Sequence, residues 1–394
     1  MDRKKNLCIP TIWDNEFLYE LKKRGLHKNI FEIYGSLPVS VIGSGRPSTS
    51  LPKVDVDHVE EHINIAHSMG IKFNFLINAP CLGLREFDPK YHNKIIKFLD
   101  WINSCKVDTV SVAVPYLLEI IKDHFPRLKV KVSVFASINS VQSAMFWEEL
   151  GADRLTLDLA INRDFKLIKK IKESTKCDIE VITNNLCLYQ CPYRFYHSNI
   201  VGHASQNDVS EIAIKMFDSL NYPMIKCSLK MLTNLSELIK ARWIRPEDLE
   251  IYQKFGVDFF KIEGRTRNKV FILLSATAYS QRKYDGNLLD IVRLHPCSEN
   301  SSLRKSIDYY HDPPIYIDNT KLEGFILPFI KGMRCEEGCN KCKYCDKICS
   351  DIVYIIDEER RKKCLEKLKK LEKVMVRMSK ILNSHAIEKS YPYF

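Results

Sequence analysis

Five cysteines fall within fifteen residues in RCEEGCNKCKYCDKICSD (334–351). Four of them follow the spacing C-x2-C-x2-C-x3-C: Cys339, Cys342, Cys345 and Cys349. Bacterial ferredoxins use this spacing to hold a [4Fe–4S] cluster, because short gaps let one tight loop direct successive thiolates at one cluster. Cys335 is a fifth candidate ligand. A structural zinc ion bound by four of the five is the alternative, so the stretch predicts either an iron–sulfur cluster or zinc.

A second, sparser set of cysteines occurs earlier in the chain. Cys187 and Cys191 lie in ITNNLCLYQCPYRFYHSNIVGHAS (182–205), Cys227 lies in MIKCSLK, and Cys81 lies in NAPCLG. Four thiolates are enough to hold a [4Fe–4S] cube. We therefore predict a further metal site at Cys187, Cys191 and Cys227, with Cys81 as the candidate fourth ligand.

Polar side chains with acid–base or anion-binding chemistry surround the second set. Those predicted to orient a substrate or move protons are Tyr193, Arg194, His197, His203 and Glu263. Those predicted to bind substrate are Arg46, Asn78, Asn185 and Arg265, the two arginines by bidentate contacts to carboxylates. Glu263 has an alternative role as the ion-pair partner of Arg265.

The common hydrolase motifs G-x-S-x-G and H-E-x-x-H do not occur, and neither does a P-loop. A cysteine that binds a metal is also not free to attack a peptide bond. The sequence therefore offers no conventional hydrolase machinery.

These residues need a scaffold, and the chain predicts one in eight short β-rich runs that alternate with helical stretches. The runs are 6–13, 30–37, 72–78, 107–114, 129–136, 152–159, 177–184 and 257–264. Eight strand–helix units of this length fit a closed (β/α)8 TIM-like barrel, an α/β fold whose site lies at the carboxyl ends of the strands. A doubly wound open sheet is the alternative, but no G-x-G-x-x-G follows the first run.

The pattern changes after the eighth run. Residues 268–292 predict a helix and a capped turn, 295–319 predict irregular structure, and 357–382 predict a long charged helix. We expect a barrel domain over 1–292 and a Cys-rich module with a C-terminal helix over 293–394. Because the triplet Cys335, Cys339 and Cys342 follows the barrel, it argues against a radical-SAM enzyme, which carries its triplet after the first strand.

Composition predicts a globular cytoplasmic protein. The 394 residues are 45% hydrophobic and 28% charged, and no apolar stretch has the length of a signal peptide core or a membrane span. In that compartment the fourteen cysteines favour metal ligands over disulfides. The net charge of +11 fits solvated helix faces or attraction for RNA or another anion.

The motifs resemble the peptidase U32 family, the collagenase-like peptidases. The resemblance lies in KIEGR (261–265), in ELGADRLTLD (149–158) and in DIEVITNNLCLYQC (178–191) with the segment around Cys227. It implies a TIM-like barrel and a [4Fe–4S] cluster on Cys187, Cys191 and Cys227, with Cys81 as the candidate fourth ligand. TNNLC and CPYRFYHS depart from the usual family pattern, and they place the chain nearer the iron–sulfur subunits of oxygen-independent ubiquinone hydroxylation than the RNA-modifying members.

The resemblance implies an iron–sulfur oxidoreductase that hydroxylates a small-molecule or RNA substrate without oxygen. Prephenate would be an oxygen donor, the tail cluster would exchange electrons with a donor or acceptor, and a paralogous subunit would be a partner. Two alternatives stay open: a U32-type peptidase, and a non-catalytic, cluster-bearing partner subunit. No RRM, KH or zinc-finger motif occurs to support RNA binding.

Overall fold

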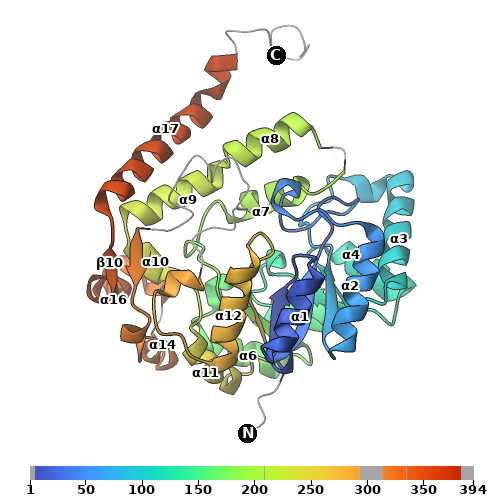
Figure 1. The fold of residues 1–394 in the computed structure, drawn as a ribbon, viewed down its shortest axis with the longest axis horizontal. Coiled ribbons are helices and arrows are strands. Elements are labelled where there is room, and N and C mark those ends of the chain that lie inside the picture. Colours follow the sequence, from blue (N-terminus) through green and yellow to red (C-terminus); the bar gives the residue numbers. More distant parts are fainter. Residues whose placement is uncertain (1–4, 208, 293–313, 334, 383–394) are drawn as a thin grey trace.

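A closed barrel of eight parallel strands forms the centre of the protein (Figure 1). The computed structural model describes residues 5–207, 209–292, 314–333 and 335–382. The strands are β1 (Leu7–Pro10), β2 (Ile30–Gly35), β3 (Lys72–Leu76), β4 (Thr109–Val112), β5 (Lys129–Val132), β6 (Arg154–Thr156), β7 (Asp178–Ile182) and β8 (Phe259–Lys261). Each lies within one of the eight predicted runs, and β8 pairs with β1 to close the barrel. The (β/α)8 prediction is confirmed.

Helices alternate with the strands, as the sequence predicts, and the connection from β7 to β8 contains several of them. They are α1 (Asn15–Lys23), α2 (Val56–Ser68), α3 (Pro89–Ser104), α4 (Pro115–His124), α5 (Val141–Glu149), α6 (Phe165–Ser174), α7 (Arg194–His203), α8 (Glu211–Ser219), α9 (Tyr222–Thr233), α10 (Ser236–Lys240), α11 (Leu249–Lys254) and α12 (Lys269–Gln281). Local sequence explains their limits: Asp88 caps α3 by accepting from the Lys90 amide, and Pro89 takes the first helical position. α6 buries Phe165, Ile168 and Ile171 along one face.

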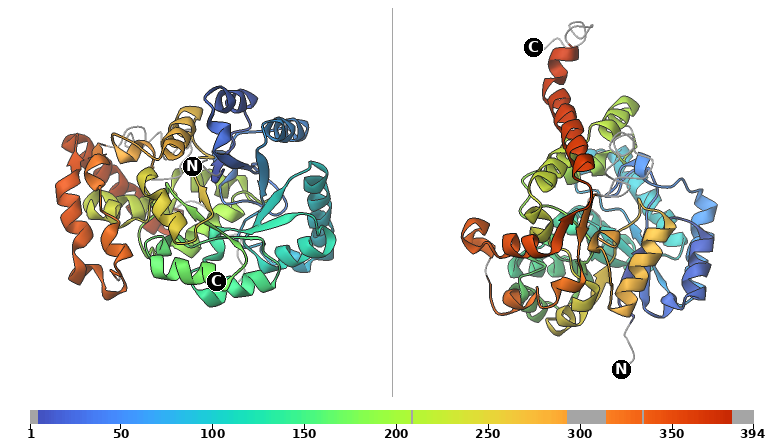
Figure 2. Two further views of the ribbon diagram at one scale, coloured as in Figure 1. Left: turned by 90° about the horizontal axis from the view of Figure 1, so that it is seen from below. Right: turned by 60° about the vertical axis from the view of Figure 1, so that its left-hand side comes forward.

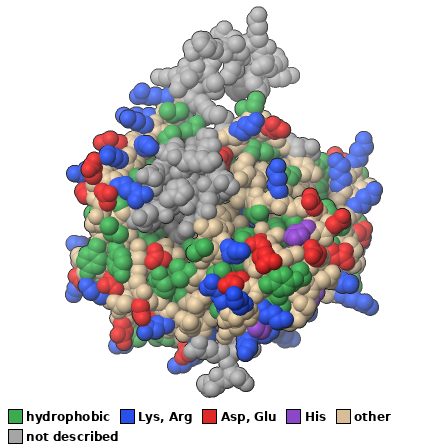
Figure 3. Space-filling view, viewed as in Figure 1, with side chains coloured by type: hydrophobic (Ala, Val, Ile, Leu, Met, Phe, Trp, Pro, Cys, Tyr) green, Lys and Arg blue, Asp and Glu red, His purple; other side chains and the backbone are tan. Residues whose placement is uncertain are grey.

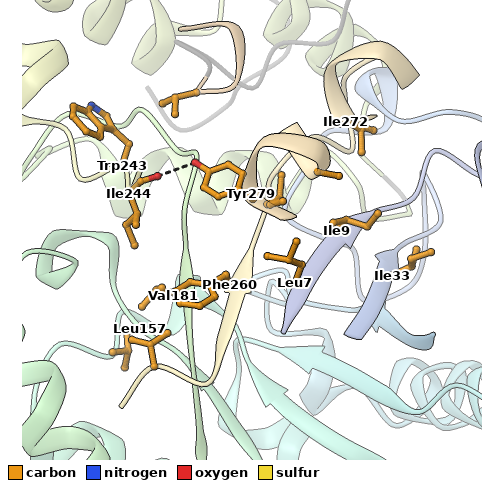
Figure 4. Close-up of a cluster of buried hydrophobic side chains, with 14 of the residues drawn as sticks. Leu7, Ile9, Ile33, Leu157, Val181, Trp243, Ile244, Phe260, Ile272 and Tyr279 are labelled. Carbon is orange, nitrogen blue, oxygen red and sulfur yellow. Dashed lines mark hydrogen bonds between the residues drawn. The ribbon is translucent and has the colours of Figure 1, made fainter. Parts of the chain in front are cut away.

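The hydrophobic core lies between the strands and the helices. Figure 4 shows part of it, where Leu7 and Ile9 from β1 lie near Ile272 and Tyr279 of α12. The Tyr279 hydroxyl donates to the Ile244 carbonyl at 2.8 Å. Tyr279 can therefore be buried in the core, because its hydroxyl has a hydrogen-bond partner.

The barrel interior is charged, whereas most barrels of this type fill it with branched apolar side chains. Glu32, Lys131 and Glu180 are fully buried, and Arg154 is 6% exposed. The Lys131 ammonium donates to both glutamates, and Arg154 Nη1 donates to Glu32 at 2.8 Å. The charges neutralise one another inside the barrel.

The tail packs against one side of the barrel (Figure 2). It comprises β9 (Ile315–Ile317), α14 (Leu327–Ile330), α15 (Cys339–Cys342), α16 (Tyr344–Ile352), β10 (Val353–Ile355) and α17 (Glu358–Leu382). β9 and β10 form an antiparallel pair, α16 packs on α10, and α17 packs on α9 before extending past the barrel. α12 confirms the helix predicted in 268–292, and α17 confirms the charged helix.

The predicted domain boundary at 292/293 adjoins residues 293–313, which lie outside the described residues. Most of the irregular stretch predicted at 295–319 lies there too, so both stay predictions. Only its last residues, from 314 on, are described, and they contribute β9.

Charged side chains of both signs are interleaved on the face shown in Figure 3. This distribution fits solvated helix faces better than a single anion-binding patch on that face. Within the described ranges, no helix combines the length and apolar character that a membrane crossing requires.

Candidate functional site

A cavity of ≈ 160 Å³ opens where loops at the carboxyl ends of the strands meet α7, α8 and α9. Three of the predicted cysteine ligands line it: Cys187, Cys191 and Cys227. Six other predicted site residues line it as well: Arg46, Asn185, Tyr193, Arg194, His197 and Glu263. Because the long connection between β7 and β8 carries α7 to α9 over this end of the barrel, it brings Cys227 to the loop that holds Cys187 and Cys191.

Of the three cavity thiols, that of Cys187 belongs to an exposed residue, and those of Cys191 and Cys227 to partly buried ones. Burial raises the pKa of the Cys191 thiol, and Cys227 Sγ donates to the Met224 carbonyl at 3.3 Å. A tetrahedral zinc site with Zn–S bonds of about 2.3 Å would hold its sulfurs about 4 Å apart. Cys187, Cys191 and Cys227 are thiolate ligands of a kind that zinc and iron–sulfur clusters both use.

Glu263 organises the mouth of the cavity. Its Oε1 accepts from Arg46 Nη2 at 3.2 Å, and its Oε2 accepts from Asn185 Nδ2 at 2.6 Å. The Asn185 Oδ1 in turn accepts from the Cys187 backbone amide at 2.9 Å. The carboxylate thus orients the loop that carries Cys187, and its ion-pair partner is Arg46 rather than Arg265.

His197 is half-buried in the cavity wall and is neutral at physiological pH. Burial, with a smaller contribution from the Arg46 charge, lowers its pKa to about 4. Its Nε2 lies 3.5 Å from Asn221 Nδ2. A neutral imidazole here suits proton acceptance rather than donation.

Arg194 and Tyr193 reach the cavity from the start of α7. Arg194 donates to Asp158 at the end of β6, so it is already paired with a carboxylate. The ring of Tyr193 meets that of Tyr222 edge-on at 5.9 Å. Both predicted residues are therefore held in place by neighbours from other elements.

Four predicted residues do not line the cavity: Cys81, His203, Asn78 and Arg265. The Cys81 carbonyl accepts from Gln206 Nε2 at 2.7 Å, and Gln206 also contacts His203. Asn78 bonds the Gly45 amide and the Ser133 hydroxyl, and Arg265 donates to the Ser36 hydroxyl at 2.6 Å. These four side chains therefore bond to neighbouring loops and do not face the cavity.

Some cavity residues were not predicted from the sequence. Arg267, 7% exposed, lines the cavity from the loop after β8, and the second arginine in EGRTR (263–267) was the available signal. Asn221 lines it from the cap of α9, where it accepts from the Met224 amide. Nothing in its local sequence distinguishes this cap from an ordinary one.

The tail cysteines gather at a separate hollow. Cys335, Cys339, Cys342 and Cys345 line it together with Lys240 of α10. Cys349 lies on α16, four residues after Cys345, on the next turn. All five predicted tail ligands therefore belong to one region, and four of them share one hollow.

One further group of metal-ligand types lies inside the barrel. The ligand atoms of Cys8, Glu32 and Glu180 lie within 4.8 Å of one another. Lys131 and Arg154 already pair with these carboxylates, so cations of the protein occupy the place that a metal would take. We assign this group to the structural charge network.

Comparison with known proteins shows which family this chain is similar to. Residues 50–286, more than half of the chain, match the model of peptidase family U32. The uncharacterized protease MJ1657 of Methanocaldococcus jannaschii is 31% identical over 327 residues, which cover 82% of this chain and 89% of that protein. The tRNA hydroxylation protein P of Haemophilus influenzae is 27% identical over 129 residues, 31% of this chain and 26% of that protein.

A solved U32 peptidase, Mk0906, aligns with 67% of this chain and 95% of its own at 20% identity and a TM-score of 0.49. The family assignment depends on the two sequence comparisons, because the family model covers most of the barrel and MJ1657 is similar along most of both chains. The predicted resemblance is thereby confirmed: this chain is a member of the peptidase U32 family.

Proposed function

We propose that this protein is an iron–sulfur oxidoreductase that hydroxylates a small-molecule or RNA substrate without molecular oxygen. One observation carries the proposal. Cys187, Cys191 and Cys227, from two segments of the β7–β8 connection, converge on one cavity at the catalytic end of the barrel. They would hold a [4Fe–4S] cluster, which supplies one-electron chemistry beside the substrate.

The cavity lining suits an anionic substrate or oxygen donor. Arg46, Arg194 and Arg267 line it. Arg46 and Arg194 already pair with Glu263 and Asp158, so a bound carboxylate would share or exchange these guanidinium contacts. An organic oxygen donor such as prephenate carries carboxylates of this kind. Transfer of its hydroxyl group to the substrate balances when the substrate loses a hydrogen, gains the hydroxyl and the donor takes the hydrogen.

His197 and Glu263 are the residues that could move the proton. His197 is neutral, so it can accept the hydrogen that leaves the substrate as a proton. Glu263 accepts hydrogen bonds from Arg46 and Asn185, so both of its carboxylate oxygens are engaged in orienting neighbouring groups. In this proposal His197 is the proton acceptor and Glu263 orients Arg46 and the cysteine loop.

One of the relatives supports the hydroxylase class by its name. The name of the Haemophilus relative states tRNA hydroxylation, although the similarity covers about a quarter of that protein. A paralogous U32 subunit and an electron carrier are partners that such an activity would use. A cytoplasmic location is part of the same proposal.

The first test is metal content after purification without oxygen. We expect iron and acid-labile sulfide, with absorbance in the visible region, and about four Fe lost in each of Cys187→Ala, Cys191→Ala and Cys227→Ala. Cys105→Ala, which removes a buried thiol of the outer core, is the matched control and should keep all its iron. Zinc alone, or iron that survives all three cavity substitutions, would contradict the proposal.

Cys81→Ala decides the fourth ligand. If Cys81 binds the cluster, this variant loses iron as the cavity variants do. Because Cys81 does not line the cavity, retention of iron would assign the fourth position to another residue or to substrate. Either result leaves the three-cysteine assignment testable by the variants above.

Peptidase activity is the second candidate, because MJ1657 bears the name of a protease. It predicts peptide cleavage in air by protein without iron. Hydrolysis of unfolded protein substrates by the Cys187→Ala variant at the wild-type rate would support it. A non-catalytic role predicts a bound cluster with turnover only when a paralogous subunit is present.

A further inference from the structure

Two buried arginines at the junction of barrel and tail have unsatisfied donors. Arg163 is 3% exposed and Arg242 is 5% exposed. The Nε and Nη2 of Arg163 and the Nε of Arg242 have no hydrogen-bond partner among the described residues. Leaving buried charged donors unpaired costs free energy. An anion beside Arg163 and Arg242 would reduce that cost.

The tail cysteines lie where that anion is needed. The Arg163 guanidinium lies over the ring of Phe329, 5.5 Å from its centroid, and Phe329 lines the same hollow as four of the tail cysteines. Burial raises the pKa of the Cys345 thiol there, and the charges of Arg163 and Arg242 oppose that rise. A metal centre bound by four thiolates carries net negative charge, and its sulfurs accept hydrogen bonds from nearby N–H groups. The two guanidinium groups and Lys240 would therefore stabilise a metal–thiolate centre in the tail.

The same arginine contacts the cysteine loop of the barrel. Arg242 lies over the ring of Tyr189, with its guanidinium carbon 3.7 Å from the ring centroid. Tyr189 stands between Cys187 and Cys191, two residues from each. Arg242 therefore contacts the loop that carries two cavity ligands, and its charge also acts on the thiol of the tail residue Cys345.

We propose that the tail cysteines hold a second [4Fe–4S] cluster, which exchanges single electrons with the cavity cluster through Arg242 and Tyr189. This proposal rests on the proposed function, because it needs a redox centre in the cavity. The iron–sulfur assignment rests on the C-x2-C-x2-C-x3-C spacing, and the relay on the contact of Arg242 with Tyr189.

Electrons enter at the exposed edge of the tail. Cys342 is exposed, and so are the lysines on both sides of it, Lys341 and Lys343, and Lys347 of α16. Asp346 on α16 pairs with Lys240, and the exposed acidic residues of this segment, Glu337 and Asp351, lie five and nine positions from Cys342 in the sequence. A small acidic one-electron carrier protein with an iron–sulfur or flavin group fits this basic edge.

The electron balance closes without atom transfer. The reduced carrier loses one electron, the tail cluster gains it and then passes it to the cavity cluster, and no bond or proton changes place. Hydroxyl transfer from an organic donor is itself redox-neutral. The electron therefore sets the oxidation state of the cavity cluster and is not consumed in each turnover.

The metal content of the tail is tested on the full chain. Wild type should hold about eight Fe per chain, and Cys342→Ala or Cys345→Ala should lose about four while the cavity cluster stays. The matched control is Cys364→Ala, a buried cysteine of α17 outside the motif. One zinc per chain that is lost in Cys342→Ala would overturn the proposal and leave the proposed function intact.

The path is tested by rapid-mixing reduction of the cavity cluster, followed by EPR, with a reduced acidic ferredoxin as the probe. Tyr189→Leu should slow arrival of the electron at the cavity cluster without loss of iron, while Tyr189→Phe, which keeps the ring over Arg242, should not. The variant without tail iron, Cys342→Ala, should be reduced slowly by ferredoxin and normally by dithionite. Equal ferredoxin rates in wild type and Cys342→Ala would refute the relay.

The basic edge makes a separate, charge-dependent contribution. The double variant Lys341→Glu/Lys343→Glu should lower the ferredoxin rate about tenfold or more at low salt, and high salt should reduce the difference. Loss of iron from the cavity variants tests the proposed function independently. Failure of the relay with an intact cavity cluster is thus distinguishable from failure of that function.

Discussion

At the scale of single residues, the hydrogen-bond partners of a buried polar side chain determine which protonation state it adopts, as His62 shows. His62 is fully buried beneath the first βα loop. Its Nδ1 lies 2.7 Å from Asn15 Oδ1, and its Nε2 lies 2.7 Å from the Thr11 hydroxyl. The Thr11 oxygen already accepts from the Trp13 amide, so its proton is free to point at Nε2. The neutral ring therefore satisfies both neighbours.

His62 predicts an acid-sensitive fold. Burial lowers its pKa to about 4, whereas an unfolded histidine titrates near about 6.5. Because the unfolded state binds the proton more tightly, stability is complete above about pH 6.5 and falls as the pH drops toward about 4. By about pH 5 the loss is about 2 kcal/mol.

Urea unfolding at neutral pH and near pH 5 measures this dependence. His62→Gln should reduce the difference between the free energies of unfolding at these two pH values by about 2 kcal/mol. The exposed residue His124 provides the control, because His124→Gln should leave the difference unchanged. An unchanged pH dependence in His62→Gln would show that other groups govern acid sensitivity.

At the scale of elements, three strands depend on one another through charge. β2 contributes Glu32, β5 contributes Lys131 and β7 contributes Glu180, and all three side chains are fully buried. Nearby Lys261 at the end of β8 is also buried, and desolvation lowers its pKa to about 8. The network replaces apolar packing inside the barrel, so each member needs its counter-charges.

Lys131→Met should destabilise the protein by about 3–5 kcal/mol, because it leaves two buried carboxylates with Arg154 as their remaining close partner. Lys129→Met is the matched control on the same strand. Lys129 is exposed and pairs with Asp153 at 2.8 Å, so its loss should cost about 1 kcal/mol or less. Equal free energies of unfolding for the two variants would contradict this account of the barrel interior.

At the scale of the whole molecule, the tail is joined to the barrel by specific buried contacts. Asn319, fully buried, accepts from Arg245 Nε at 3.0 Å and donates to Glu247 Oε1 at 3.1 Å and to the Tyr284 carbonyl at 2.6 Å. Arg163 lies against the rings of Trp243 and Phe325. These contacts fix the tail against the barrel, and the proposed electron path requires that arrangement.

Asn319→Ala should lower the free energy of unfolding by about 1–3 kcal/mol, because it removes the Asn319 partner of Arg245 Nε and of the Tyr284 carbonyl. It should also slow electron transfer from ferredoxin to the cavity cluster if the tail loosens. Asn340→Ala, at an exposed tail position, is the control for both measurements. Chemical unfolding followed by tryptophan fluorescence reports the change, since Trp243 lies at the junction.

Much of this arrangement was predictable from local patterns. The eight β-rich runs, the helices in 268–292 and 357–382 and the family resemblance follow from side-chain periodicity and short motifs, and each is confirmed. Where the barrel loops meet was predictable too, because parallel strands place their carboxyl ends at one edge. Nine of the predicted site residues do line the cavity at this edge.

Local pattern could not decide which residues of that edge face the cavity. Cys81, His203, Asn78 and Arg265 also follow strands or lie in the same crossover, yet they bond to the supporting loops instead. The path of a loop depends on what packs against it. Periodicity does not encode that path.

The sequence by itself determined the barrel, the cysteine spacings and the family, because each depends on residues that are close along the chain. Tertiary structure alone decided the partners of charged groups. Glu263 pairs with Arg46, 217 residues away, and Arg242 stacks on Tyr189 while its Nε stays unpaired. Such pairings arise when closure of the barrel and docking of the tail bury charges together, and buried charges must be balanced by whatever lies nearest in space.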